Sequence, residues 1–181
     1  MIRCYVTDRR QGDVRACARR AVRDGMDMIQ IREKDLPAKD LFDLVCEIRD
    51  LAAGTTTRVL VNDRLDIALA ARVDGVHLPG NGLPPERVRP HAQVVGVSTH
   101  AVEEAIAAEQ AGADFIVFGP IFESPGKKAV GLEPLRNVVA SVKIPVLAIG
   151  GITAMNCQKV LNAGAAGIAG IRLFQKVDSC F

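Results

Sequence analysis

Residues 58–78 read RVLVNDRLDIALAARVDGVHL, and this stretch holds one full copy of the pattern that decides the fold. RVLVND is a short, mostly apolar and β-branched run that predicts a strand, and GVHL predicts a second strand. Between them, RLDIALAAR has apolar residues every three to four positions, as an amphipathic helix does. A strand, a helix and a strand in succession predict a right-handed unit whose two strands pair in parallel.

The same alternation continues along the chain. Eight strands are expected: CYVT from Cys4, MIQIRE from Met28, RVLVND from Arg58, GVHL from Gly75, VVGVST from Val94, FIVFGP from Phe115, VLAIGG from Val146 and GIAGIR from Gly167. Alanine-rich helices are expected between most of them, at residues 13–25, 38–54, 64–72 and 101–113. Eight units with near-continuous apolar strands predict a closed (β/α)8 TIM barrel, an α/β fold. The alternative is an open doubly wound sheet, but no Gly-x-Gly-x-x-Gly turn follows the first strand.

The length of the chain sets its organisation. With 181 residues, 49% of them hydrophobic, it can bury one substantial core, so we expect a single domain over residues 1–181. After GIAGIR only LFQKVDSCF remains. We therefore expect the last outer helix of the barrel to be truncated or missing.

Composition narrows the classes of partner. The 23 basic and 21 acidic residues are well mixed and give a net charge of +2, so no basic block indicates nucleic acid or a membrane surface. Five scattered cysteines (Cys4, Cys17, Cys46, Cys157 and Cys180) form no metal or disulfide pattern and are typical of reduced thiols. No leader or membrane-spanning run is visible, which favours a cytoplasmic protein. Whether it forms a homo-oligomer stays open.

Polar residues and a pair of glycines follow the expected strands, at the end of the barrel where such folds have their active sites. They are Asp8, Arg32, Lys34, Asn62, Asp63, Ser98, His100, Ser124, Lys127, Gly150, Gly151 and Arg172. The loop ESPGKK after the sixth strand combines small residues, a hydroxyl and two lysines. Backbone amides, a serine hydroxyl and an ammonium group together suit the oxygens of a phosphate.

Several of these signals also have a simpler explanation. Arg32 and Lys34 point the same way from an extended strand end, which suits an anion between them, although two solvated loop charges would look alike. Asn62 and Asp63 offer oxygen ligands for Mg²⁺, but such a pair is also an ordinary N-cap for the next helix. The paired glycines of IGGI let a phosphate approach the backbone, yet tight packing explains them too.

The three histidines give weaker signals. His77 lies inside GVHL and is interpreted as a packed strand residue, and His91 is expected in an exposed loop. His100 follows Ser98 by two residues, but no third group is visible that could complete a nucleophilic triad.

The ordered series of motifs resembles one family over nearly the whole chain. The motifs are CYVTD, MIQIREKD, VLVNDRLDIALAARVDGVHL, VGVSTH, GADFIVFGPIFESPGKK, PVLAIGGI and AGAAGIAGIR. They are similar to those of thiamine phosphate synthase and of its relative, the TenI-type thiazole tautomerase. The resemblance implies a (β/α)8 barrel and a transferase that joins hydroxymethylpyrimidine diphosphate to thiazole phosphate and releases pyrophosphate, with Mg²⁺ as cofactor.

The resemblance also assigns roles to residues. It implies that Gln30, Arg32, Lys34, Asn62, Ser98 and Lys127 contact the pyrimidine diphosphate, with Arg32, Lys34, Ser98 and Lys127 acting on the leaving group. Asp63 is implied as the Mg²⁺ ligand. The thiazole phosphate site is implied at Ser124, Pro125, Gly126, Gly151, Ile171 and Arg172.

Three positions depart from the synthase or the tautomerase pattern. The synthase pattern has a second Mg²⁺-binding aspartate where the sequence PGNGLP has Gly82, and a serine where this chain has Arg172. The tautomerase uses a histidine where this chain has Pro120. The retained cations favour synthase activity. A tautomerase, or a thiazole phosphate-binding protein without turnover, remains the alternative.

Overall fold

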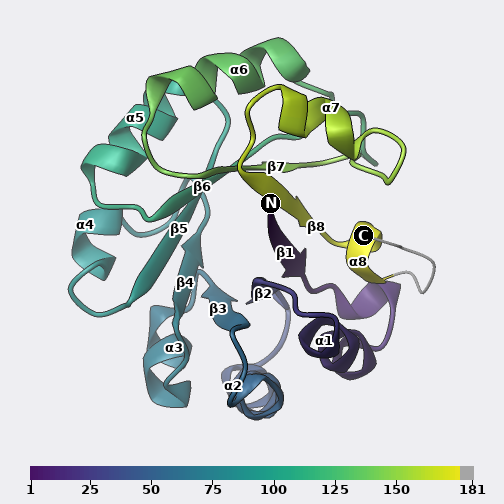
Figure 1. Cartoon of the computed structure of the whole chain (residues 1–181). Helices are drawn as coiled ribbons and strands as arrows, with labels where there is room; N and C mark the ends of the chain where they lie inside the picture. The colour runs from purple at the N-terminus through teal and green to yellow at the C-terminus, as the bar shows by residue number, and fades with distance from the viewer. Residues whose placement is uncertain (176–181) are drawn as a thin grey trace.

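Eight parallel strands close into a barrel in their order along the chain (Figure 1). This computed structural model describes residues 1–175. The strands are β1 (Ile2–Val6), β2 (Met28–Ile31), β3 (Arg58–Asn62), β4 (Gly75–Leu78), β5 (Val94–Thr99), β6 (Phe115–Phe118), β7 (Val146–Ile149) and β8 (Gly167–Gly170). β1 pairs with both β2 and β8, which completes the circle. The closed barrel is confirmed, and the open-sheet alternative is wrong.

Helices surround the strands (Figure 1). They are α1 (Val14–Arg23), α2 (Ala38–Ala52), α3 (Leu65–Ala71), α4 (Pro85–Val88), α5 (Val102–Gln110), α6 (Leu132–Ser141), α7 (Cys157–Asn162) and α8 (Arg172–Gln175), with a 3₁₀ turn η1 (Arg9–Gln11) before α1. Each of the four helical ranges expected from the sequence contains a helix. α4 has no signal in the sequence, because its four residues are too few to show a helical period.

The barrel is built from a repeated two-strand unit. After α1, α3, α5 and α7 comes a residue with left-handed backbone: Gly25, Arg72, Gly112 or Gly164. The next residue donates its N–H to a carbonyl five residues earlier, as in a Schellman motif, and an even-numbered strand follows. In three of these turns an aspartate then accepts the N–H of a residue in the preceding strand: Asp27 from Arg3, Asp74 from Val59 and Asp114 from Val95.

Alternate strand residues form two separate cores. One set, which includes Cys4, Leu60, Phe115 and Leu147, forms a cluster made only of strand residues and a short extension of β8, so it fills the inside of the barrel. The opposite set packs outward against the helices in two larger clusters. Gly96 makes room inside the barrel, because a Cβ at this position would lie 2.2 Å from the ring of Phe115.

The eighth helix is short, as expected, with four residues in the described part of the chain. α1 lies beside it (Figure 1), and the guanidinium of Arg20 donates hydrogen bonds to the carbonyls of Phe174 and Gln175 at 3.0 and 2.7 Å. The buried side chain of Gln175 donates to the Tyr5 hydroxyl and to the Asp8 carbonyl. These contacts attach the end of the described chain to the first strand and helix.

The cysteines of the described residues, Cys4, Cys17, Cys46 and Cys157, are all free, and Cys180 lies outside those residues. Burial in the barrel raises the pKa of Cys4 to about 12, so this thiol is protonated at neutral pH. Among residues 1–175 there is no helix with the length and apolar character needed to cross a membrane. Cytoplasmic location and a single domain stay predictions from the sequence.

Candidate active site at the carboxyl end of the barrel

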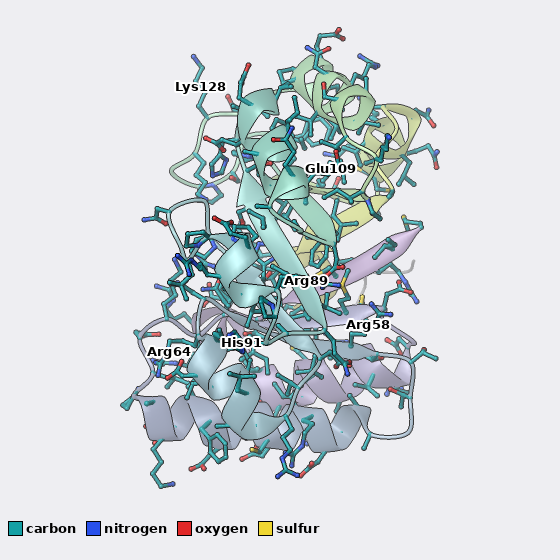
Figure 2. The ribbon with its side chains drawn as sticks, turned by 90° about the vertical axis from the view of Figure 1, so that its left-hand side faces the viewer. Arg58, Arg64, Arg89, His91, Glu109 and Lys128 are labelled. Carbon is teal, nitrogen blue, oxygen red and sulfur yellow. The ribbon has the colours of Figure 1, made fainter. Side chains whose placement is uncertain are left out.

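The expected site residues lie at one end of the barrel, because all eight strands run in the same direction. Figure 2 makes this visible: Arg58, which begins β3, lies on the right, whereas Arg64, just after β3, lies on the left. Lys128, in the loop after β6, is on the same left-hand side as Arg64. Arg32, Asn62, Ser98, Lys127 and Gly151 all belong to the carboxyl ends of their strands or to the loops that follow.

The end of β2 is held firmly against the end of β1. Arg32 is half-buried and its backbone N–H donates to the hydroxyl of Thr7, while Lys34 is exposed. Between these cations, Glu33 is buried, and both of its carboxylate oxygens accept the N–H of Arg9 at 3.1 Å. The clamp fixes the backbone that carries Arg32 and Lys34, and leaves their side chains free.

Asn62 and Asp63 do not cap the helix that follows them. The N-cap of α3 is Arg64, and no side-chain hydrogen bond caps this helix, so the N-cap interpretation of Asn62 and Asp63 is wrong. The amide oxygen of Asn62 instead accepts a hydrogen bond from Gln30, at 3.1 Å, in the buried wall of the site. Asp63 is exposed and has φ = 64°, which is uncommon outside glycine. Its N–H donates to the carbonyl of His77, and this bond holds the unusual backbone.

Gly82 lies next to Asp63. A Cβ on Gly82 would be 3.0 Å from a carboxylate oxygen of Asp63, so a side chain here would project toward that carboxylate. Among residues 1–175, no three His, Cys, Asp or Glu side chains gather as a metal cluster. One carboxylate is still compatible with Mg²⁺, which is commonly held by one or two carboxylates together with water and substrate phosphate oxygens. The residues present therefore fit a magnesium ion shared with a bound diphosphate.

His77 and Ser98 form a hydrogen-bonded pair between β4 and β5. The imidazole Nε2 lies 2.7 Å from Ser98 Oγ, and the imidazole ring is almost completely buried. Burial, with a smaller contribution from the charge of Arg32, lowers the pKa of His77 to about 4. The ring is therefore neutral at pH 7. Its other nitrogen, Nδ1, has no hydrogen-bond partner in the described part of the chain.

Residues 124–127 form a tight turn after β6. The Lys127 N–H donates to the Ser124 carbonyl at 2.9 Å, and Gly126 has φ = 72°, as Pro-Gly does in a type II turn. The turn exposes the Lys127 side chain. This arrangement leaves the Gly126 N–H without a backbone acceptor among the described residues, so it remains available to a ligand.

The paired glycines after β7 are required by packing. A Cβ on Gly150 would lie 2.4 Å from Pro120, and a Cβ on Gly151 would lie 2.5 Å from the carbonyl of Glu123. Both glycines also have positive φ, at 96° and 64°. The packing explanation is therefore correct, and any phosphate contact at Gly151 is an additional role. After β8, Ile171 is half-buried, and Arg172 begins α8 with its side chain exposed.

Four cations of this end form no ion pair with acidic side chains of residues 1–175: Arg32, Lys34, Lys127 and Arg172. Arg9 and Arg64, which follow β1 and β3 at the same end, pair with carboxylates, as Arg15 and Arg89 do elsewhere. Four free cations around one rim repel each other unless an anion lies among them. The rim is therefore suited to a highly charged anion.

The inner wall near the rim differs in polarity from side to side. On β2 to β5, the inward-facing residues nearest the rim are polar: Gln30, Asn62, His77 and Ser98. The corresponding residues of β6, β7, β8 and β1 are Val117, Ile149, Ile171 and Val6, which belong to the interior cluster or pack on it. One half of the wall can hydrogen-bond a polar ring, and the other half can exclude water.

The sequence interpretation missed the role of His77. The residue is packed in a strand, as expected, but it also faces inward and contacts Ser98. The alternation of inward and outward residues along the strand could have shown this role, since His77 is paired in register with Asn62.

His91 is exposed, as expected. His100 is exposed and bonds the Gly119 carbonyl, so it connects two loops. The carboxylate of Asp8 caps η1. Burial alone would raise the pKa of this carboxyl group, but hydrogen bonds from Arg10 and Gln11 lower it.

Comparison with known proteins identifies the family and agrees with the fold. A family model described as thiamine monophosphate synthase matches residues 4–174. The chain is 44% identical over 160 residues to the thiamine-phosphate synthase of Methanocella arvoryzae, covering 84% of this chain and 75% of that protein. It is 40% identical over 174 residues to the thiamine-phosphate synthase of a Roseiflexus species, covering 91% and 74%. A solved structure, the thiamine phosphate pyrophosphorylase from Pyrococcus furiosus, superposes with a TM-score of 0.91 at 36% identity, covering 98% of this chain and 89% of that one.

Proposed function

Since this chain belongs to the thiamine monophosphate synthase family, we propose that it joins hydroxymethylpyrimidine diphosphate to thiazole phosphate and releases pyrophosphate. The bond between the pyrimidine methylene carbon and the diphosphate oxygen breaks, and its electron pair leaves with pyrophosphate. The lone pair of the thiazole nitrogen then forms the new carbon–nitrogen bond, which gives thiamine phosphate. The reaction needs stabilisation of the leaving group and a dry pocket, with little acid–base chemistry.

The observation that carries the proposal is the set of unpaired cations around the rim. Arg32, Lys34 and Lys127 have no acidic partner among the described residues, so their charge is available to a diphosphate. Charge on the leaving oxygen increases as the bond breaks. Preorganised cations and hydroxyl donors such as Ser98 therefore stabilise the transition state more than the bound substrate.

The inner wall supports a place for the pyrimidine. Gln30 and Asn62 are hydrogen-bonded to each other, which fixes their amide groups beneath the rim. A fixed pair of amides presents donors and acceptors to a ring that carries ring nitrogens and an amino group. The ring would lie below the diphosphate, with its methylene carbon directed toward the apolar half of the wall.

Asp63 is the residue that would hold Mg²⁺, together with diphosphate oxygens and water. When bound, the ion would add positive charge beside the departing pyrophosphate. The exposed carboxylate of Asp63 and its strained backbone support this assignment, because such strain is concentrated at functional sites.

For the thiazole phosphate we propose the loops after β6, β7 and β8. Ser124, Pro125 and Gly126 form the turn beside Gly151, since Gly151 packs directly on the loop that leads into this turn. Ile171 and Arg172 come directly after β8, the next strand. The ring would then contact the apolar half of the wall, which contains Val117 and Ile149. Arg172 supplies a guanidinium for the phosphate where the family pattern has a smaller residue.

A tautomerase is the weaker candidate for this chain. Its reaction moves a proton and needs a histidine at the position of Pro120, which has no group able to transfer one. His77 does not replace it, because its ring is neutral, buried and already bonded to Ser98.

The experiment is a reaction of the purified protein with both substrates and Mg²⁺. We expect release of pyrophosphate and formation of thiamine phosphate in equal amounts. Each substrate alone serves as a control. Neither alone should release pyrophosphate at the rate of the complete reaction. Absence of product at every Mg²⁺ concentration, with thiazole phosphate still bound, would contradict the synthase proposal and favour a binding protein.

A further inference from the structure

The pair formed by His77 and Ser98 carries an inference about how the site orients a hydroxyl group. The Nε2–Oγ distance of 2.7 Å shows a short hydrogen bond, but a bond between imidazole and hydroxyl can run in either direction. The direction matters. If Ser98 donates its proton to the imidazole, only lone pairs of Oγ remain toward the rim, and they repel an anion. If the imidazole donates, the proton of Ser98 is free.

The surroundings of Nδ1 decide the direction. This nitrogen is buried and has no hydrogen-bond partner among residues 1–175. A proton on Nδ1 would leave a buried N–H donor unsatisfied, which folded proteins avoid more strictly than an unsatisfied acceptor. A doubly protonated ring would have the same unsatisfied N–H and would also face the positive charge of Arg32. The proton therefore belongs on Nε2, and Nδ1 carries a lone pair.

We propose that His77 is a positioning residue, which donates its Nε2–H to Ser98 and so directs the Ser98 hydroxyl proton toward the anion bound at the rim. The proposal rests on the proposed function for the identity of that anion, the diphosphate leaving group. Ser98 is half-buried on β5, on the same polar half of the wall as Arg32 and Asn62. Its hydroxyl then contributes a donor, as an anionic oxygen requires.

The environment of the pair supports a fixed orientation. His77 lies on Phe115, with ring centroids 5.8 Å apart, and Gly96 leaves the space that this ring fills. The carbonyl of His77 accepts the N–H of Asp63. The imidazole thus packs against the ring of Phe115, and its own backbone is held by the hydrogen bond to Asp63. Both contacts restrict rotation of the side chain.

The same geometry argues against a nucleophilic role for Ser98. A serine nucleophile transfers its proton to a histidine whose other nitrogen is stabilised by a third group. No such group contacts Nδ1 in the described chain, and the cation Arg32 is close to the ring. The pair orients a hydroxyl and does not generate an alkoxide.

The first test measures the tautomer without any ligand. In ¹⁵N NMR spectra of the whole protein, protonated and unprotonated ring nitrogens of histidine resonate in separate ranges, and His77→Gln identifies the signals by their loss. We expect an N–H signature at Nε2 and a lone-pair signature at Nδ1. A proton on Nδ1, or on both nitrogens at neutral pH, would overturn the proposal.

The second test is a double-mutant cycle with inorganic pyrophosphate as the probe and calorimetry as the readout. We expect Ser98→Ala and His77→Leu each to weaken binding about tenfold, since one hydrogen bond to a charged group is lost. The double variant should bind as weakly as Ser98→Ala alone. His77→Gln, which keeps an N–H donor near the position of Nε2, should restore most of the affinity. His91→Gln, a change in an exposed loop, is the matched control and should bind as the unmodified protein does.

The outcomes separate the two levels of the argument. Full additivity in the cycle, or unchanged binding by His77→Leu, would overturn the positioning role even if the protein makes thiamine phosphate. Failure of the unmodified protein to bind pyrophosphate would overturn the proposed function and the anion role of the pair. In that case the tautomer still decides whether His77 donates to Ser98. If His77→Leu does not fold, His77→Gln and the NMR measurement remain decisive.

Discussion

Single residues at the rim are kept in states that the fold alone does not require. Asp63 has a left-handed backbone, although the chain could use glycine or asparagine there with less strain. Lys127 is held on an exposed turn and forms no ion pair with the described acidic side chains. Under the proposed function a bound diphosphate explains each of these features, and neither contributes to the core.

Replacing Lys127 by alanine should affect turnover and leave folding unchanged. Loss of a contact to developing charge raises a barrier by about 3 kcal/mol, so we expect kcat to fall about a hundredfold. The urea midpoint should not move, because the side chain is exposed. The adjacent Lys128→Ala is the matched control and should retain full activity. Equal losses in both variants would show that only the general charge of the loop matters.

Gly82→Asp should lower the Mg²⁺ concentration that gives half-maximal pyrophosphate release. The new carboxylate would lie beside Asp63, and two close carboxylates repel unless a cation is bound between them. Pro79 must shift slightly, since a Cβ would lie 2.8 Å from its Cδ. Gly82→Asn has the same shape without the charge and should leave the Mg²⁺ dependence unchanged. A flat Mg²⁺ response in every variant would count against the synthase reaction.

At the scale of elements, the repeated turn before the even-numbered strands connects three strands through one residue. Asp74 accepts the Val59 N–H at 2.7 Å, and its own backbone bonds to Val59 and Val94. Asp27 and Asp114 occupy equivalent places. The fourth turn has Ala166 instead, so one junction of the barrel lacks this carboxylate.

Asp74→Ala should destabilise the protein by about 1–2 kcal/mol, because the Val59 N–H loses a charged acceptor. Urea unfolding followed by circular dichroism measures the change. Asp50→Ala is the control. Asp50 is exposed near the end of α2 and its ion pair with Arg49 is a surface pair, so the expected change is below about 0.5 kcal/mol. Similar changes in the two variants would remove the special role of the turn.

The strands could be predicted because burial on both faces requires short apolar runs, and each run in the sequence contains one strand. α4 could not be predicted, since its four residues are too few to show a helical period. The rim cations were predictable from strand order alone. The backbone of Asp63 was not, because it depends on the His77 carbonyl of another strand.

At the scale of the whole molecule, the closed barrel separates two kinds of interior. The polar residues of β2 to β5 and the apolar residues of β6 to β1 meet at one mouth. Under the proposed function, this division lets a charged donor substrate and a ring acceptor lie side by side. The polar half has an energetic cost. It keeps an imidazole inside the barrel, where only the neutral form of the ring is stable.

The stability of the fold should therefore depend on pH through His77. Burial, and to a smaller extent Arg32, lowers its pKa from 6.5 to about 4 in the folded protein. Between these values the unfolded chain binds a proton that the folded protein does not, so the free energy of unfolding decreases as the pH falls from about 6.5 to 4. The total loss is on the order of 3 kcal/mol. Carboxylates titrate in the lower part of this range as well, so the comparison between variants isolates the histidine.

Urea unfolding at pH 7.5 and pH 5 measures this dependence. His77→Gln should lose less stability between the two pH values than the unmodified protein, because glutamine does not titrate. His91→Gln should retain the full loss, since His91 is exposed and its substitution does not change the barrel interior. If His77→Gln instead follows the unmodified protein at both pH values, the imidazole takes up its proton without cost. The interior of the polar half would then be more hydrated than its burial indicates.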